Sequence, residues 1–310
     1  MKRVFVVANL SKPSVAEALE ELRPWLAQRA QLVGVERNCD YDFTKLEADL
    51  ILVLGGDGTL LSVARRLQGR QIPVMGVNFG RLGFLAGFTP GNLRDSLEQF
   101  FREGLPIRPR QMLEASVIPT STICTWCSDE EIVANRRFVA TALNDAVVTA
   151  GPPFRMVELA ISADSDEGIK YFGDGVIVST ASGSTAYNVS AGGPIISPDV
   201  ECFCITPICP HSLSFRPVVV SAKTTVVIVA ARVNPGTTLS CDGQVGTPLA
   251  AGERVIVRRS SHVVPLVENP RDREWRALAE KLNWAVSPNY NDHEGGPANK
   301  GWAGPGGGEV

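Results

Sequence analysis

Five consecutive residues, GGDGT at 55–59, carry the strongest chemical signal in this 310-residue chain. They follow an apolar run that ends at Leu54, and a run with helical spacing comes directly after them. Glycines between a strand and a helix let the backbone approach a ligand, and a helix N-terminus favours an anion. Asp57 would repel a bare phosphate unless it bound a metal ion or accepted a proton, as aspartates do in phosphoryl transfer. The alternative is a turn aspartate that caps the helix.

Neither of two common nucleotide-binding fingerprints is present. The chain contains no GxxxxGK[ST] motif, and its first apolar run continues into ANLSKP rather than into GxGxxG. A nucleotide site in this protein therefore requires a different layout.

Two shorter stretches offer groups that suit a nucleotide. In NFGRLGFLAGF, at 78–88, glycines follow a predicted strand, and Phe84 offers a flat face to a base. A hydrophobic loop that covers the core explains this stretch equally well. In ALNDAVV, Asn144 and Asp145 supply an amide and a carboxylate that can hold a ribose diol or an adenine edge. A capped turn is the alternative for this pair.

The longest polar stretch is GDGVIVSTASGSTAYNVSAGGPIISP, at 173–198. Its small hydroxylated residues and glycines suit a wall pressed against a polar ligand, and SGSTAYNVSAGG leaves room for a helical turn. Downstream, His211 lies in ITPICPHSLSFRPVVV, where a structural hydrogen bond is the simpler role. The CDGQ stretch at 241–244 is typical of a turn with a possible ligand contact.

The elements that position these stretches change along the chain. Roughly the first hundred residues alternate between strands and helices, which predicts a parallel sheet with helices on both faces. The predicted strands are 3–9, 49–54 and 72–79, and the predicted helices are 14–29, 59–68 and 92–104, the last with Asn92 as N-cap and Gly104 beyond its end.

A β-rich region follows, with short strands and many turn residues from about 108 to 265. A helical pattern returns at DREWRALAEKLNW, and because it has no sheet of its own we expect it to pack on the first domain. The predicted organisation is an α/β domain formed by 1–106 with 267–286, and a β-rich dinucleotide-binding domain at 107–266. The Gly/Pro-rich remainder, 287–310, is predicted to be disordered.

Composition limits the classes of partner. The formal net charge of −3 provides no basic field to attract nucleic acid or an anionic membrane. No stretch approaches the roughly 20 apolar residues of a membrane-spanning helix, and the N-terminus lacks a signal-peptide pattern, so we expect a cytoplasmic protein. The seven cysteines include one C-x-x-C pair but no second pair with zinc-site spacing. They predict free thiols and no metal site of their own.

Taken in order, these stretches resemble the ATP-dependent NAD kinases over about residues 1–286. The resemblance rests on GGDGT, NFGRLGFLAGF, LNDAVV, GDGVIVSTASGSTAYNVSAGGPI, ITPICPHSLSFRPVVV and CDGQ. It implies an N-terminal α/β domain and a β-rich C-terminal domain. It also implies a homodimer or homotetramer that uses NAD⁺ and ATP, with a divalent ion such as Mg²⁺ accompanying ATP. The implied reaction is NAD⁺ + ATP → NADP⁺ + ADP.

The resemblance assigns roles to particular residues. It implies that Asp57 lies beside the 2′-hydroxyl of the adenosine ribose, as base or orienter, and that Phe84 lies against the adenine. Asp174 and His211 are implied to reach a ligand held by a neighbouring subunit. The implied donor-phosphate residues are Gly55, Gly56, Gly58 and Thr59; the other implied NAD-binding residues are Asn144, Asp145, Ser182, Thr185, Ala186, Tyr187 and Ser190.

Two other functions remain open from the sequence. One is a kinase of the same superfamily that acts on a lipid or another hydroxyl acceptor, because similar glycine-aspartate turns occur in lipid kinases. The other is a non-catalytic NAD(P) sensor. Turnover of NAD⁺ to NADP⁺ distinguishes the predicted kinase from both.

Overall fold

The structure is a computed structural model that describes residues 1–37, 41–80, 83–120, 128–164 and 168–270. Residues 1–272 form one compact unit. The predicted helix after 271 and the predicted tail at 287–310 lie outside the described residues. No helix in the described ranges is long and apolar enough to cross a membrane. The domain boundaries given above stay a prediction.

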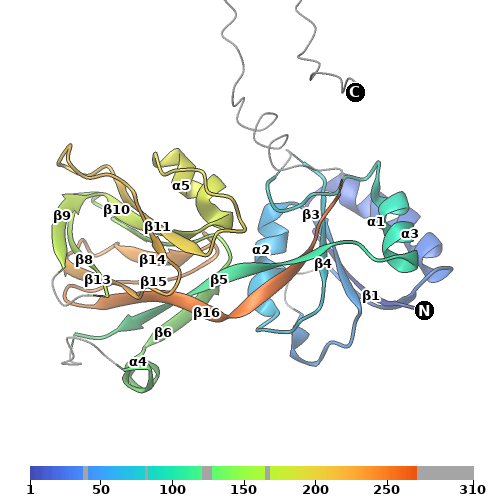
Figure 1. Cartoon of the computed structure of the whole chain (residues 1–310), viewed down its shortest axis with the longest axis horizontal. Coiled ribbons are helices and arrows are strands. Elements are labelled where there is room, and N and C mark those ends of the chain that lie inside the picture. The colour runs from blue at the N-terminus through green and yellow to red at the C-terminus, as the bar shows by residue number, and fades with distance from the viewer. Residues whose placement is uncertain (38–40, 81–82, 121–127, 165–167, 271–310) are drawn as a thin grey trace, which may run out of the picture. The chain divides into compact units, whose positions relative to one another are not determined.

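The N-terminal part is built on parallel strands, as the alternating pattern predicts (Figure 1). Their order in the sheet is β2-β1-β3-β4. The strands are β1 (Arg3–Ala8), β2 (Gln31–Glu36), β3 (Leu50–Gly55) and β4 (Val74–Asn78). β2 was not predicted, because it is the edge strand, and five of its six residues are only partly buried or exposed. Its sequence therefore lacks the continuous apolar run of β1 and β3.

Helices cover both faces of this parallel sheet, which confirms the prediction. The helices are α1 (Pro13–Ala27), α2 (Asp57–Arg66) and α3 (Leu93–Arg102), with a short 3₁₀ turn η1 (Phe43–Lys45). Apolar residues of α1 and α3, such as Leu19 and Leu97, share one core cluster with β1 and β3. Leu60 and Ala64 of α2 belong to a different cluster on the opposite face.

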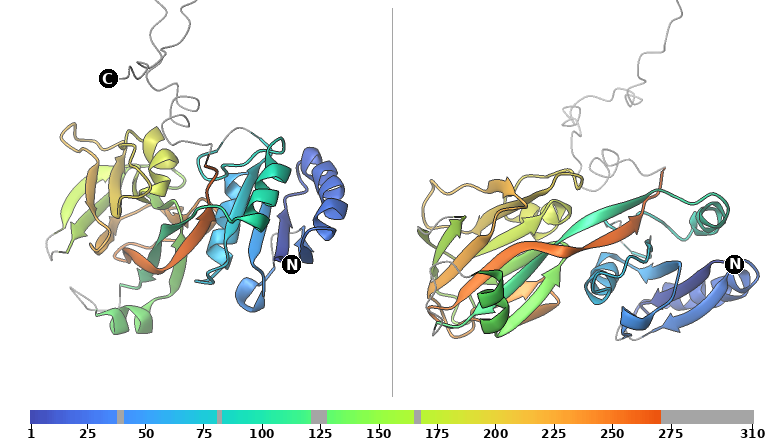
Figure 2. Two further views of the ribbon diagram at one scale, coloured as in Figure 1. Left: turned by 45° about the vertical axis from the view of Figure 1, so that its right-hand side comes forward. Right: turned by 60° about the horizontal axis from the view of Figure 1, so that its bottom comes forward.

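A long strand, β16 (Arg254–Val267), continues the same sheet into the β-rich part. It pairs in parallel with β4 and in antiparallel with β5 (Ile107–Ile118), and β5 and β16 run side by side in both views of Figure 2. The remaining strands of this sheet are β6 (Phe138–Ala142), β8 (Val157–Ala163), β9 (Ile169–Gly173) and β13 (Val226–Arg232). The two parts of the chain therefore share one ten-stranded sheet.

A second, antiparallel sheet of six strands packs against the β-rich part of the first. Its order is β12-β11-β10-β7-β14-β15. The strands are β12 (Val218–Ser221), β11 (Cys202–Ile208), β10 (Gly175–Thr180), β7 (Asp145–Thr149), β14 (Thr238–Cys241) and β15 (Val245–Pro248). Every second residue enters the core between the sheets, as in Val176 and Val178 of β10 and Val226 and Ile228 of β13. The predicted β-rich texture is confirmed.

Short helices interrupt the β-rich part at two places. SGSTAYNVSAGG forms the 3₁₀ turn η2 (Ser182–Thr185) and the helix α5 (Tyr187–Ser190), as the sequence suggested. The helix α4 (Asp129–Asn135), between β5 and β6, was not predicted. Its signal was present, because Ser128 and Glu131 form a capping box at its N-terminus.

Candidate functional site

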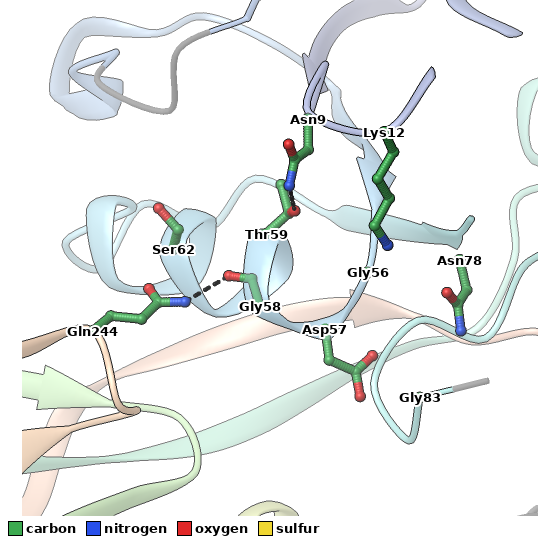
Figure 3. A pocket seen from close by; sticks show the side chains of 10 residues that line it. All are labelled: Asn9, Lys12, Gly56, Asp57, Gly58, Thr59, Ser62, Asn78, Gly83 and Gln244. Carbon is green, nitrogen blue, oxygen red and sulfur yellow. Dashed lines mark hydrogen bonds between the residues drawn. The ribbon is translucent and has the colours of Figure 1, made fainter. Parts of the chain in front are cut away.

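The strand order places a crevice at the carboxyl ends of β1 and β3. The chain leaves β1 for β2 on one side and later returns to β3 on the other, so the strand order reverses between β1 and β3. Ligands of open α/β sheets bind at such a switch point. A pocket of about 590 Å³ opens there (Figure 3). It is lined by Asn9, Lys12, Gly56, Asp57, Gly58, Thr59, Ser62, Asn78, Gly83 and Gln244.

The GGDGT segment turns sharply from β3 into α2 beside this pocket. Gly56 is the N-cap in an extended conformation, and the helix begins at Asp57, earlier than predicted. Gly55 is required because a Cβ there would lie 2.5 Å from the Thr59 hydroxyl oxygen. That hydroxyl accepts a hydrogen bond from Asn9 Nδ2 at 3.4 Å. The first helical turn therefore presents backbone N–H groups and little side-chain bulk to the pocket.

The Asp57 carboxylate does not cap its own helix, which answers one alternative left by the sequence. Its oxygens instead accept backbone N–H groups from the NFGRLGFLAGF loop: Phe84 at 2.8 Å, Leu85 at 3.4 Å and Ala86 at 3.1 Å. Asp57 thus joins the two glycine-rich stretches and lines the pocket at their junction.

A glycine at position 83 makes this junction possible. A Cβ added to Gly83 would overlap the Asp57 carboxylate. The loop backbone can therefore reach Asp57 only without a side chain at this position. Phe84 itself is half-buried. Its predicted contact with the adenine stays a prediction.

Asn144, in the turn between β6 and β7, and Asp145, the first residue of β7, are both buried. The Asp242 carboxylate, in the CDGQ stretch, accepts backbone N–H groups from Leu143 at 3.0 Å, Asn144 at 2.7 Å and Asp145 at 3.3 Å. Asp242 itself has a positive φ of 52°, which aspartate tolerates better than most residues. The CDGQ stretch thus holds the turn that carries the predicted NAD-binding pair.

Two buried polar atoms near this turn have no hydrogen-bond partner among the described residues. They are Asn144 Oδ1 and Ser179 Oγ. Ser179 pairs with Asp145 across β10 and β7, so the two atoms belong to the same neighbourhood. Buried polar atoms are almost always bonded, because an unmade bond costs about 1–3 kcal/mol. Both atoms have almost no accessible surface, so a polar ligand would bond to them only after neighbouring side chains move.

Burial shifts the pKa values of the ionisable groups in this region. Burial, with a smaller contribution from the Asp242 carboxylate, raises the pKa of Asp145 to about 7. Burial also raises the pKa of Asp242, although its three backbone N–H bonds oppose that rise. The neighbouring Cys241 thiol has its pKa raised to about 12, chiefly by burial. Perturbed groups of this kind cluster at functional sites.

The hydroxylated segment 180–190 packs against the same turn. Thr180 Oγ1 donates to Leu143 O at 2.6 Å, and a Cβ on Gly183 would overlap the Asn144 backbone. Ser182 is buried, Thr185 and Ala186 are half-buried, and Tyr187 and Ser190 are exposed. Ser182 therefore lies close to Asn144, and its predicted contact with NAD⁺ stays a prediction.

Asn188 anchors this segment and was not singled out from the sequence. It is fully buried, and its Nδ2 donates to Ser184 O at 3.0 Å and Pro194 O at 2.9 Å. Its Oδ1 accepts from Thr206 Oγ1 at 2.6 Å. Every polar atom of its side chain is thus used inside the protein, and its role is structural.

Asp174 and His211 are not brought to this cluster. Asp174 precedes β10 while Ser182 follows it, so the two lie at opposite ends of that strand. Asp174 and His211 are both exposed, and His211 N donates to Phe172 O at 2.8 Å. Their predicted approach to a ligand requires a second subunit.

Six pocket-lining residues were missed or left undecided by the sequence: Asn9, Lys12, Ser62, Asn78, Gly83 and Gln244. Asn9 and Lys12 follow β1, and Asn78 ends β4. Their position after predicted strands, at the carboxyl edge of the sheet, was the sequence signal that could have identified them. Gln244, considered only as a possible contact, donates from Nε2 to Gly58 O at 2.7 Å. Its Oε1 accepts from Arg65 Nη1 at 2.9 Å.

Family models match both parts of the chain. The ATP-NAD kinase N-terminal domain matches residues 36–105, and the ATP-NAD kinase C-terminal domain matches residues 143–269. The NAD kinase of Rhodopirellula baltica is 36% identical over 91% of this chain and 87% of its own length. That of Syntrophotalea carbinolica is 38% identical over 92% of this chain and 99% of its own length.

Solved structures agree with these relatives. Yeast NADH kinase complexed with NADH matches with a TM-score of 0.80 and 25% identity, over 93% of this chain and 89% of that one. An NAD kinase from Archaeoglobus fulgidus in complex with ATP matches with a TM-score of 0.69 and 27% identity, over 91% of this chain and 98% of that one. These matches extend along nearly the whole length of the chain. They agree with the glycine turn and its aspartate and with the hydroxylated segment. The chain therefore belongs to the NAD kinase family.

Proposed function

We propose that this protein transfers the γ-phosphate of ATP to the 2′-hydroxyl of the adenosine ribose of NAD⁺, giving NADP⁺ and ADP. The observation that carries the proposal is the position of Asp57. Its carboxylate lines a pocket at the topological switch point, at the first turn of α2. A donor phosphate at that helix N-terminus would lie beside the carboxylate, which is the arrangement that phosphoryl transfer to a hydroxyl needs.

The donor phosphates bind at the turn from β3 into α2. Gly56 and Gly58 line the pocket without side chains, and Thr59 contributes a nearly buried hydroxyl. The unpaired N–H groups of the first helical turn and the helix dipole attract the phosphate oxygens. Gly55, Gly56, Gly58 and Thr59 are therefore assigned to the donor.

The donor set of the pocket fits a divalent ion that arrives with ATP. Mg²⁺ in kinases is held by one or two carboxylates together with substrate phosphates, and it keeps several waters. The pocket offers the Asp57 carboxylate, with the side-chain oxygens of Asn78 and Ser62 as further hard donors. Among the described residues no group of three or more His, Cys, Asp or Glu side chains forms a protein-only metal site. When bound, the ion neutralises charge on the transferred phosphoryl group.

NAD⁺ binds at the buried turn that Asp242 holds. Asn144 Oδ1 and Ser179 Oγ accept donors of the dinucleotide once neighbouring side chains move, and Asp145 accepts from ribose hydroxyls when it is ionised. Leu143, which precedes this turn, packs in the same core cluster as Leu60 and Leu61 of α2. The acceptor turn thus lies against the helix whose N-terminus carries Asp57. The remaining dinucleotide contacts are assigned to Phe84, Ser182, Thr185, Ala186, Tyr187 and Ser190.

Asp57 accepts the proton of the attacking hydroxyl or orients that hydroxyl. The oxygen of the 2′-hydroxyl forms a bond to the γ-phosphorus, and the bond from that phosphorus to the bridging oxygen of ADP breaks. The backbone N–H groups of Phe84, Leu85 and Ala86 fix the direction of the carboxylate. This orientation reduces the entropy lost on reaching the transition state.

Asp174 and His211 act on a ligand of a neighbouring copy in a homodimer or homotetramer. Their exposure, at the end of β10 remote from Ser182, supports this proposal. If the protein proves to be a monomer in solution at assay concentrations, this part of the proposal is wrong.

The decisive experiment is NADP⁺ formation from NAD⁺, ATP and Mg²⁺ by the purified protein and by Asp57→Asn. We expect turnover by the native protein, and a loss on the order of 10²–10⁴-fold in kcat for the variant. Calorimetric titration with NAD⁺ should show that the variant still binds the acceptor. Full activity in Asp57→Asn would contradict the proposed role of Asp57. NAD⁺ binding without turnover by the native protein would favour a non-catalytic NAD(P) sensor.

A further inference from the structure

The loop after β1 places Lys12 in the donor pocket. Lys12 is the N-cap of α1, and Pro13 occupies the first position of that helix. A residue before proline is restricted to extended backbone, and Lys12 has φ −102° and ψ 115°. The ANLSKP sequence therefore sets the backbone from which this side chain extends to the pocket (Figure 3).

Asn9 fixes the same loop to the GGDGT helix. Its Oδ1 accepts from Ser11 N at 3.1 Å and from Ser11 Oγ at 2.7 Å, which closes a local Asx-type turn. Its Nδ2 donates to Thr59 Oγ1 at 3.4 Å, and its backbone N–H donates to Leu54 O at 3.0 Å. The loop is thus held against the strand and the helix that carry the donor site.

The Lys12 ammonium group lies beside Gly55, Gly56 and Gly80. It has no acidic partner in the described part of the chain. Its Nζ donates to Gly55 O at a long 3.4 Å. The same atom would lie 3.3 Å from a Cβ on Gly56 and 3.0 Å from a Cβ on Gly80. No carboxylate of the described residues forms an ion pair with Lys12. It is also the one cationic side chain among the described residues that line the pocket.

We propose that Lys12 binds the phosphate chain of the donor nucleotide and stabilises the charge that develops on ADP as it leaves. This inference rests on the proposed function and adds a residue that the sequence motifs do not contain. A compact ammonium on a flexible stem suits a phosphate contact, as in P-loop proteins, although this chain lacks the P-loop motif. The Lys12 ammonium lies against the same glycine turn that begins α2, so the ammonium and the helix N-terminus would bind the phosphates together.

The first test measures binding without turnover. Isothermal titration with ADP and with adenosine is carried out on the native chain, Lys12→Met, Lys12→Arg and Lys223→Met. Lys223 is an exposed lysine in the turn before β13 and lines no part of the pocket, so its variant controls for net charge. We expect Lys12→Met to weaken ADP binding on the order of 10- to 100-fold, the range for a charge-assisted hydrogen bond. Adenosine binding should stay within twofold, and Lys12→Arg should recover part of the ADP affinity.

Turnover provides the second test. In Lys12→Met, kcat/KM for ATP should fall at least tenfold while KM for NAD⁺ stays within twofold; Lys223→Met should match the native protein. Equal weakening of ADP and adenosine would overturn the proposal, because it would indicate a structural role for Lys12. Unchanged ADP affinity would overturn it as well.

The binding test separates this inference from the proposed function. If the native chain binds ADP through Lys12 but forms no NADP⁺, the phosphate contact stands and the kinase proposal fails. If NADP⁺ forms at native rates in Lys12→Met, the kinase proposal stands and the role of Lys12 fails.

Discussion

Gln244 Nε2 donates a 2.7 Å hydrogen bond to Gly58 O, joining residues 186 positions apart in the chain. Gly58 lies in the first turn of α2, and Gln244 lies in the turn between β14 and β15 of the second sheet. Two residues earlier, Asp242 holds the turn with Asn144 and Asp145. One hairpin turn therefore contacts both the donor turn and the acceptor turn.

Loss of the Gln244 hydrogen bonds should lower kcat/KM for ATP more than it lowers the free energy of unfolding. Gln244→Met keeps the length of the side chain and removes its bonds to Gly58 and Arg65. We expect kcat/KM for ATP to fall about three- to tenfold, the effect of one net hydrogen bond of roughly 0.5–1.5 kcal/mol. Steady-state kinetics with ATP varied at saturating NAD⁺ measures the change.

The matched control for this variant is Gln99→Met. Gln99 is an exposed glutamine on α3 and lines no part of the donor pocket. Its variant should have native kinetics. If Gln244→Met and Gln99→Met gave the same kcat/KM for ATP, the Gln244 bonds of the hairpin turn would not contribute to the use of ATP.

Gly83→Ala should damage catalysis by displacing Asp57 or the loop that holds it. The new methyl group would overlap the carboxylate, so either Asp57 or the N–H groups of Phe84 and Ala86 must move. A misplacement of about 1 Å costs on the order of 10²-fold in rate. We therefore expect kcat for NADP⁺ formation to fall by about 10- to 100-fold.

Gly91→Ala is the control for the loss of a glycine. At this exposed position an added Cβ meets only the Thr89 hydroxyl, at 4.0 Å. Its kcat should equal that of the native protein. A Gly83→Ala variant with native kcat would show that the loop and Asp57 rearrange freely during the reaction.

Ser179→Ala should stabilise the protein and weaken NAD⁺ binding at the same time. Its buried hydroxyl oxygen has no partner within the part of the chain that the structure describes, so its removal relieves a penalty of about 1 kcal/mol or more. If the dinucleotide satisfies this hydroxyl, the Kd for NAD⁺ should rise about three- to tenfold. Urea denaturation and calorimetric titration measure the two effects.

Ser116→Ala is a close control, because Ser116 Oγ on β5 is likewise buried without a partner. Its variant should gain a similar free energy of unfolding and bind NAD⁺ as the native protein does. Equal NAD⁺ affinity in both variants would argue against Ser179 as a ligand contact.

The contribution of Asp145 to the stability of the ligand-free protein should fall as pH rises from about 4 to about 7. Folding raises the pKa of Asp145 from 3.8 to about 7, so the folded state holds a proton that the unfolded chain has released. This contribution to the free energy of unfolding therefore decreases with pH across this window, and the loss is complete above pH 7. Asp145→Asn should remove this loss, which is on the order of a few kcal/mol.

Urea denaturation at pH 5, 6, 7 and 8 tests this prediction. The stability of Asp145→Asn relative to the native protein should increase from pH 5 to 7 and then level off. Glu17→Gln, at an exposed position of α1, is the control for the loss of one carboxyl group. A pH-independent difference for Asp145→Asn would mean that Asp145 is ionised throughout in the folded protein.

Local pattern alone determined the elements that carry the chemistry. The apolar run before Gly55 and the helical spacing after Thr59 predicted the strand, turn and helix, because both periodicities are properties of neighbouring residues. The change to β-rich texture was visible for the same reason. β2 and α4 escaped prediction because one is a partly exposed edge strand and the other a short helix inside a connection.

Tertiary structure decided which of these groups meet. The strand order placed Lys12 beside Gly55, and the pairing of β14 with β7 placed Asp242 beside Asn144, contacts that no local pattern encodes. The same arrangement separated Asp174 from Ser182 by the length of β10. Side-chain types and their spacing specify what a residue can do chemically. Sheet order and long-range packing specify which partners it has. Sheet order and packing depend on contacts between residues far apart in the chain, so local sequence does not determine them.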